Sequence, residues 1–333
     1  MRSSEGGKME EKMTTSAGAA DPAERKERRV HTGWRFVILF LLIFAMLNGF
    51  LTLALCDDVQ MRVLIRKAAE NTAEDVIIGT SMARAGVDPD TVSKVTGKSC
   101  ANYSIPMSGP MDQYYLIRLM TEHGQAPKRV IYDVDPTYCD RDDGINHYYA
   151  YPLGAVRLQY YCAGLKYNWH VTISPWSLKT DNLSRMGEIL SKKLEYLKTP
   201  DAYQDYRGFD PVAGSYVYIA QDNSDFSVTK EADYWLRKMA SYCKEHGIEL
   251  ILMEMPVGKQ VYYDYNANYR QSADAYFQSL AEDCGVTLWN MNELPTSVFD
   301  SDTSQYADGF GHLSEQAAEE FSYVLGNMLS QED

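Results

Sequence analysis

The chain has 333 residues, of which 45% are hydrophobic and 23% charged, a composition that excludes a disordered chain and can form a large core. Asp and Glu outnumber Lys and Arg by 46 to 32, giving a formal net charge of −14. No basic cluster occurs beyond the N-terminal tail, which argues against nucleic-acid binding. The six cysteines form no CxxC motif and have no closely spaced histidine, so the sequence predicts no metal site.

The N-terminal part consists of a polar tail and a long apolar segment. Residues 1–33 are small, polar and charged, which predicts a disordered cytoplasmic tail. Residues 36–56 form 21 consecutive uncharged positions, and about 20 helical residues span a bilayer core. We predict a transmembrane signal anchor over residues 34–56. A buried core helix is an alternative. So is a cleaved signal, although the segment is long and no A-x-A site follows it.

The charges that flank this segment predict its orientation. Five basic residues lie between positions 25 and 35, whereas two aspartates follow at positions 57 and 58. The positive-inside rule then places the N-terminus in the cytoplasm and the C-terminal domain outside, as a single-pass protein of the cell membrane. Outside the cytoplasm the cysteines could pair, with Cys139–Cys162 as one candidate, but the sequence leaves the pairing open.

The remaining chain is predicted to be a short amphipathic stalk, residues 57–72, followed by one ectodomain, residues 73–333. Four continuous apolar runs in it indicate strands that are covered on both faces: residues 75–79, 129–135, 249–255 and 286–290. Four segments have helical periodicity: residues 109–124, 231–246, 268–284 and the last one from Ser314, a plausible N-cap. This alternation predicts an α/β sandwich of three layers with a parallel sheet.

Residues 137–228 interrupt this alternation and are predicted to be an insertion. They contain 12 of the 25 tyrosines. Aromatic faces suit sugar rings, so the insertion could line a binding cleft for carbohydrate. The alternative is a packed cap without a binding role.

A candidate nucleophile follows the first predicted strand of the ectodomain. Ser81 lies on the turn after this strand, where its hydroxyl would project at the C-terminal edge of the sheet, and Gly79 permits a tight turn. The Ser81 N–H at a helix N-terminus could face a developing oxyanion. Taken alone, a serine here is also a common helix cap.

A candidate base and acid lie together before the last helix. A serine nucleophile needs a base that removes its proton, and the histidine needs a carboxylate that orients it. His312 is the only histidine with an acid, Asp308, within four residues in a glycine-rich loop. As an isolated pair they would equally suit a structural role.

The order of these motifs resembles the SGNH (GDSL-like) hydrolase superfamily. More narrowly, residues 73–330 resemble its membrane-anchored, extracytoplasmic branch, which includes the DltD-like D-alanyl transfer proteins and the alginate O-acetylation proteins. The resemblance rests on five stretches: VIIGTSMARAGVDPDTV, CANYSIPMSGPMDQYYLIRLM, PKRVIYDVDP, LILMEMP and DGFGHLSEQAAEEF. It implies a flavodoxin-like fold, with Ser81 as nucleophile, His312 as base and Asp308 as its partner. It also implies Gly109 or Asn102 as a further oxyanion or substrate-binding residue.

The expected function is a serine-dependent acyl-ester hydrolase or acyltransferase that acts on an envelope polysaccharide or related polymer through an acyl-Ser81 intermediate. This chemistry needs no metal or organic cofactor, and a transferase would have a multi-span membrane acyltransferase as its natural partner. The alternative is a catalytically silent envelope module that binds a glycan or a membrane partner. The four-residue spacing of Asp308 and His312, where the superfamily has three, and the absence of a G-x-N-D motif favour this alternative. Asp302 is a second candidate for the acid.

Overall fold

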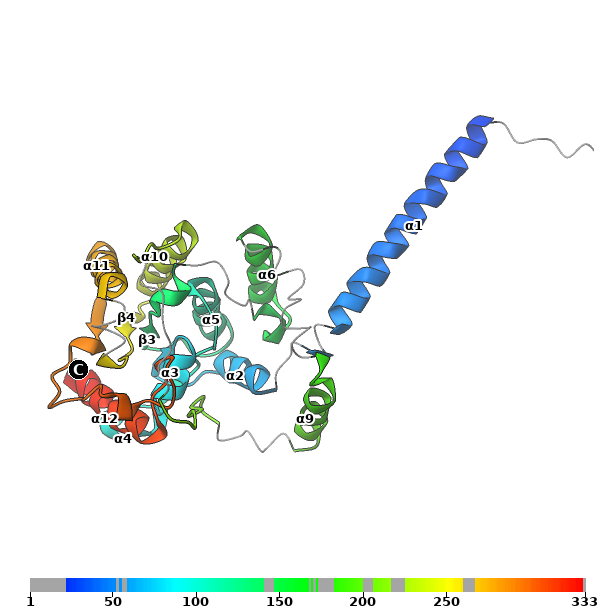
Figure 1. The fold of residues 1–333 in the computed structure, drawn as a ribbon. Helices are drawn as coiled ribbons and strands as arrows, with labels where there is room; N and C mark the ends of the chain where they lie inside the picture. The colour runs from blue at the N-terminus through cyan, green and yellow to red at the C-terminus, as the bar shows by residue number, and fades with distance from the viewer. Residues whose placement is uncertain are drawn as a thin grey trace, which may run out of the picture. The chain divides into compact units, whose positions relative to one another are not determined.

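The computed structural model describes residues 22–51, 54–55, 59–140, 147–167, 169, 172, 183–199, 206–216, 225–259 and 267–331 (Figure 1). The chain divides into two compact units, Met1–Phe50 and Leu51–Asp333.

The first unit is formed by helix α1 (Pro22–Leu51). Within it, the 19 residues of Gly33–Leu51 have a mean hydropathy of 2.1 and none of them is buried. This helix is long and apolar enough to cross a membrane, as a signal anchor or a signal sequence would. Two predicted boundaries change. The helix already begins at Pro22, within the tail predicted to be disordered, and it ends at Leu51 instead of residue 56.

The second unit is built on a five-stranded parallel sheet, as predicted. The order β2-β1-β3-β4-β5 is that of a flavodoxin-like fold. Its strands are β1 (Asp75–Ile78), β2 (Cys100–Asn102), β3 (Arg129–Asp133), β4 (Glu249–Glu254) and β5 (Thr287–Asn290). Strand β2 was not predicted, because three residues are too few to show a pattern. The other four strands lie within or next to the predicted runs.

Helices cover both faces of this sheet. One face carries α2 (Val59–Ala69), α5 (Pro110–His123), α10 (Lys230–Glu245) and α11 (Ala267–Cys284). The other carries α3 (Ser81–Gly86), α4 (Pro89–Thr96) and α12 (Glu315–Gln331). Because side chains alternate along a strand, Val76 and Ile78 of β1 pack against the first group and Ile77 against the second. Strands β1, β3 and β4 are therefore covered on both faces, which explains their continuous apolar runs, whereas the residues of the edge strand β5 are exposed or half-buried.

Helix α2 corrects the predicted stalk. Six of its eleven residues are buried, among them Leu64, Ile65 and Ala68, and they belong to the same hydrophobic cluster as α5 and α10. Residues 59–69 are therefore part of the folded domain and do not form a free spacer. The amphipathic periodicity of residues 59–69 was visible in the sequence. The surface that buries their apolar side chains is formed largely by α5, which begins about 40 positions later in the chain.

The tyrosine-rich insertion contains α6 (Ala155–Tyr167) and α9 (Met186–Lys198), besides short 3-10 turns at Pro136–Tyr138 and Tyr148–Ala150. Tyr149, Tyr151 and Tyr160 are buried, and the Tyr160 ring stacks on Tyr115 of α5 at 4.8 Å between ring centroids. These three tyrosines pack within the hydrophobic core of the domain. Trp176 and His170 of the insertion lie outside the described residues.

The suggested Cys139–Cys162 pair does not form. Cys139 is a buried free thiol and Cys162 an exposed one. Cys56 lies outside the described residues, and the other described cysteines are free thiols as well.

Two further 3-10 turns, Met291–Glu293 and Thr303–Gln305, lead from β5 towards the loop of Asp308 and His312.

Candidate active site

Ser81 is held at the C-terminal edge of the sheet by the turn between β1 and α3. Gly79 has φ +149°, and a Cβ atom built there would lie 2.4 Å from Cβ of Asp133, so the turn requires glycine. Thr80 caps α3 by accepting a hydrogen bond from the Met82 N–H at 3.3 Å. Ser81 is the first residue of α3 and half-buried, and its own N–H has no intrahelical acceptor.

The side chain of Asp133, at the end of β3, stabilises the turn between β1 and α3. Its Oδ2 accepts hydrogen bonds from the Thr80 N–H at 3.3 Å and from the Thr80 hydroxyl at 3.0 Å. Burial, reinforced by the nearby Asp135, raises the pKa of Asp133 to about 7. The sequence analysis assigned Asp133 no role. The signal available was an acid at the end of a neighbouring parallel strand, where side chains meet at one edge of the sheet.

Asp308 and His312 lie on a loop that is closed at its base. Tyr306 and Leu313 form an isolated antiparallel bridge, and the Ala307 N–H donates to the His312 carbonyl at 2.8 Å. Gly311 adopts φ +105°, which turns the chain back towards Asp308. Oδ1 of Asp308 accepts hydrogen bonds from the backbone N–H groups of Phe310 and His312, at 2.9 and 3.2 Å. The conformation of this loop therefore accommodates the four-residue spacing between Asp308 and His312.

The two segments meet in a serine–histidine–aspartate arrangement. Oγ of Ser81 lies 2.9 Å from Nε2 of His312, and Nδ1 of His312 lies 2.6 Å from Oδ2 of Asp308. In the tautomer that carries its proton on Nδ1, His312 donates to Asp308 and accepts the Ser81 proton at Nε2. The side chains of His312 and Asp308 are 16% and 28% exposed, so the pair is partly shielded and still accessible. Asp302, the second candidate acid, is exposed and accepts a hydrogen bond from Ser304.

Two residues predicted to assist at the oxyanion are used differently in the structure. Asn102 is completely buried, and both its amide hydrogens are donated, to the carbonyls of Ala83 and Val87 at 2.8 Å each. The Gly109 N–H donates to the Asp112 carboxylate at 2.9 Å, at the start of α5. Asn102 therefore ties the ends of β2 and α3 together, Gly109 caps α5, and neither offers a free donor.

Met107, which was not among the predicted site residues, lies in the loop between β2 and α5. Met107 has φ +56°, the only positive value for a non-glycine residue in the described part of the chain, and its side chain is 47% exposed. Its loop is held against the Ser81 turn, because the Ile105 N–H and the Gln113 amide each donate to the Gly79 carbonyl at 2.8 Å. Strained backbone of this kind clusters at functional sites. The residue type gives no indication in the sequence that Met107 adopts a positive φ.

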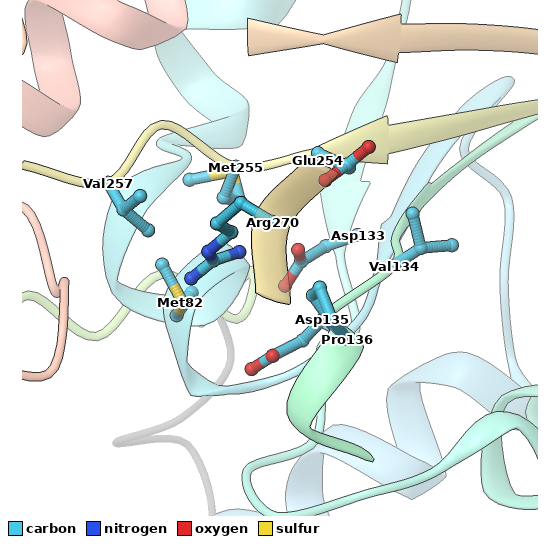
Figure 2. A pocket seen from close by; sticks show the side chains of 9 residues that line it. All are labelled: Met82, Asp133, Val134, Asp135, Pro136, Glu254, Met255, Val257 and Arg270. Atoms are coloured by element: carbon cyan, nitrogen blue, oxygen red, sulfur yellow. The ribbon is translucent and has the colours of Figure 1, made fainter. Parts of the chain in front are cut away.

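A small hollow at the carboxyl ends of β3 and β4 is lined by Met82, Asp133, Val134, Asp135, Pro136, Glu254, Met255, Val257 and Arg270, and Ser81 is not among its lining residues (Figure 2). Figure 2 shows the Arg270 guanidinium extending from α11 towards Met82, with the carboxyl group of Asp133 beside it. Asp135 accepts from the Thr137 N–H at 2.9 Å and caps a 3-10 turn, as expected for a residue at a strand end. Burial and the nearby Asp274 raise the pKa of Glu254.

The lining of this small hollow combines apolar side chains with three acids and one arginine. Within the described residues, His, Cys, Asp and Glu side chains form no group that could hold a metal ion.

Comparisons with known proteins give similarity of structure only. No family model matches the chain, and no curated protein sequence matches it. Among solved structures, a Streptococcus pneumonia protein named for platelet activating factor is 12% identical, with a TM-score of 0.42, covering 89% of this chain and 99% of that one.

Two esterases are similar at the same level. The psychrotrophic esterase EstA from Pseudoalteromonas sp. is 10% identical, with a TM-score of 0.36, covering 78% of this chain and 97% of that one. The acetylxylan esterase Axe2 from Geobacillus stearothermophilus is 13% identical, with a TM-score of 0.32, covering 77% and 93%. The chain thus has low-identity structural similarity to SGNH or GDSL-like esterases and acylhydrolases.

Proposed function

We propose that this protein is a serine-dependent acyl-ester hydrolase or acyltransferase that works through an acyl-Ser81 intermediate. The observation that carries the proposal is the pair of hydrogen-bond distances from Ser81 to His312 and from His312 to Asp308, 2.9 and 2.6 Å. Segments 231 residues apart in the chain come together in the geometry that nucleophilic catalysis by serine requires.

The reaction follows from the roles of these three groups. Oγ of Ser81 attacks the acyl carbonyl carbon while Nε2 of His312 takes the hydroxyl proton, and Asp308 stabilises the imidazolium that forms. When the tetrahedral intermediate collapses, the ester C–O bond breaks and His312 returns the proton to the leaving alcohol. Water or a sugar hydroxyl then attacks acyl-Ser81 by the same steps. The Ser81 N–H, the first of α3, would donate to the oxyanion.

The substrate class rests on topology and on the resemblance of residues 73–330 to envelope-modifying SGNH proteins. If α1 is a retained anchor with a cytoplasmic N-terminus, the ectodomain meets only extracytoplasmic esters. Acylated envelope polysaccharides or related polymers are then the substrates within reach. A transferase of this kind would receive its acyl group from a multi-span membrane acyltransferase.

A catalytically silent module is the second candidate, and one observation favours it. Gly109 and Asn102 have committed their donors elsewhere, which leaves fewer groups to stabilise an oxyanion. Such a protein would keep the fold and bind a glycan or a membrane partner without turnover.

Labelling with a fluorophosphonate probe separates the two candidates. We expect the detergent-solubilised wild type to be labelled, Ser81→Ala to lose all label, and His312→Ala to react far more slowly. Ser241→Ala, which removes an exposed serine on α10, is the matched control and should label like the wild type. An unlabelled wild type, or label that persists in Ser81→Ala, would contradict the enzyme proposal.

A further inference from the structure

Helix α9 exposes an apolar stripe. None of its thirteen residues is fully buried. Large apolar side chains recur at intervals of three and four along one face: Met186 (40% exposed), Leu190 (40%), Leu194 (57%) and Leu197 (74%). Leu183, just before the helix, is 57% exposed as well. The stripe from Met186 to Leu197 is roughly 16 Å long, at about 1.5 Å per residue.

A different face of α9 packs against the domain. Ile189, Lys193 and Tyr196 are half-buried, and α9 contacts α2. Tyr196 hydrogen-bonds Arg66 of α2. The stripe is therefore not the surface by which the helix is attached to the protein.

The packed face of α9 also reaches the segment that follows the apolar helix. Nζ of Lys193 lies 3.5 Å from the carbonyl oxygen of Ala54. Ala54 is three residues beyond Leu51, where α1 ends, and three residues of chain span at most about 10 Å. If α1 crosses the bilayer, this segment and the side chain bonded to it lie at the membrane surface.

The charge of this region is opposite to that of the domain as a whole. Residues 36–333 contain 24 basic and 40 acidic residues. By contrast, residues 183–199 contain four basic and two acidic residues, and residues 59–70, which comprise α2 and Glu70, contain three basic residues and one acidic residue. Amphipathic helices with basic side chains beside an apolar face bind the interface of anionic membranes.

We propose that α9 lies on the outer surface of the membrane that holds the protein, with Met186, Leu190, Leu194 and Leu197 inserted between the lipids, and that the net positive charge of this region favours anionic headgroups. This inference rests on the proposed membrane anchor and is independent of catalysis. It gives the ectodomain a second attachment to the bilayer. Because the anchor keeps α9 at a high effective concentration near the lipids, α9 can stay bound to the membrane even if its own affinity for lipid is weak.

Photo-crosslinking of the full chain in vesicles tests this assignment. The photoreactive residue p-benzoylphenylalanine replaces Leu194 on the stripe, Glu188 on the charged face as matched control, or Leu42 within α1. After reconstitution in phosphatidylcholine–phosphatidylglycerol vesicles and irradiation, lipid adducts are measured by mass spectrometry. We expect adducts at positions 42 and 194 and several-fold fewer at 188, with the yield at 194 falling in vesicles of phosphatidylcholine alone.

Three results would overturn the proposal in distinguishable ways. Adducts at 42 with no excess at 194 over 188 would leave the anchor intact and remove α9 from the membrane. Crosslinks at 194 to a second copy of the chain would make the stripe a protein interface. Absence of adducts at 42 would remove the anchor on which the inference depends. Both exposed positions on α9 can be substituted without disturbing the core, and circular dichroism verifies that each variant is folded.

Discussion

The imidazole ring of His312 bonds to Oδ2 of Asp308 at 2.6 Å, so the role of this carboxylate can be tested by one substitution. In Asp308→Asn the amide can donate to Nδ1 and favour the imidazole tautomer that cannot accept the Ser81 proton. We expect kcat for p-nitrophenyl acetate to fall by about 10⁴-fold, as in serine proteases with the same change. The exposed Asp302→Asn is the matched control and should retain activity. Wild-type turnover in Asp308→Asn, together with an inactive Ser81→Ala, would indicate a serine–histidine dyad or another acid.

The buried Asp133 predicts a pH dependence of stability. Its pKa is raised from 3.8 to about 7 in the folded protein. The folded state therefore retains a proton that the unfolded state releases, and the stabilisation present below pH 4 is lost as pH rises through 7. The free energy of unfolding of the wild type should fall relative to Asp133→Asn over this window, by on the order of 4 kcal/mol.

Urea unfolding of the solubilised protein from pH 4 to pH 8, followed by circular dichroism, measures this difference. Asp302→Asn serves as the exposed control and should leave the pH profile of the wild type unchanged. A constant difference between wild type and Asp133→Asn across the range would show that Asp133 carries the same charge in the folded and unfolded states.

At the scale of elements, the turn between β1 and α3 depends on the missing side chain of Gly79. In Gly79→Ala the new Cβ would lie 2.4 Å from Cβ of Asp133 at a backbone φ of +149°. Strain and overpacking together should lower the free energy of unfolding by at least about 3 kcal/mol. Because the turn presents Ser81, phosphonate labelling should fall as well.

Gly97, at the end of α4, provides the matched control for that turn. It also has a positive φ, +70°, but no atom lies within 4 Å of the position that a Cβ would occupy. Gly97→Ala should therefore lower the free energy of unfolding by only about 1 kcal/mol and leave labelling unchanged. Equal losses of stability in the two variants would mean that the contact with Asp133 does not matter.

At the scale of the whole molecule, the charges around the apolar helix predict its topology. Five basic residues precede it and aspartates follow it, so the N-terminus should be cytoplasmic. A phosphatase that is active only outside the cytoplasm, fused after Asp333, should be active. Protease added to intact cells should digest the ectodomain and spare the tail. An inactive fusion would place the domain in the cytoplasm and exclude envelope esters as substrates.

The sequence by itself determined the features that depend on local pattern. The apolar helix, four of the five strands and the helices α5, α10, α11 and α12 each follow from the composition or periodicity of a single segment. Ser81 and the Asp308–His312 pair were found as candidates because they stand on a turn and a loop whose glycines are visible in the sequence. The contact of His312 with Ser81, 231 residues earlier, was not fixed by the sequence, because the loop of Asp308 and His312 does not directly follow a strand.

Only the tertiary structure decided how distant segments share contacts and hydrogen bonds. Asn102 was a reasonable oxyanion donor until its partners, 15 and 19 residues away, were known. Asp133 supports a turn 53 positions earlier, and α2 is part of the core because α5 covers it. Each of these outcomes depends on which buried donor meets which acceptor, or which apolar faces meet. The physical reason is that burial is a property of the folded arrangement, whereas periodicity and turn chemistry are properties of neighbouring residues.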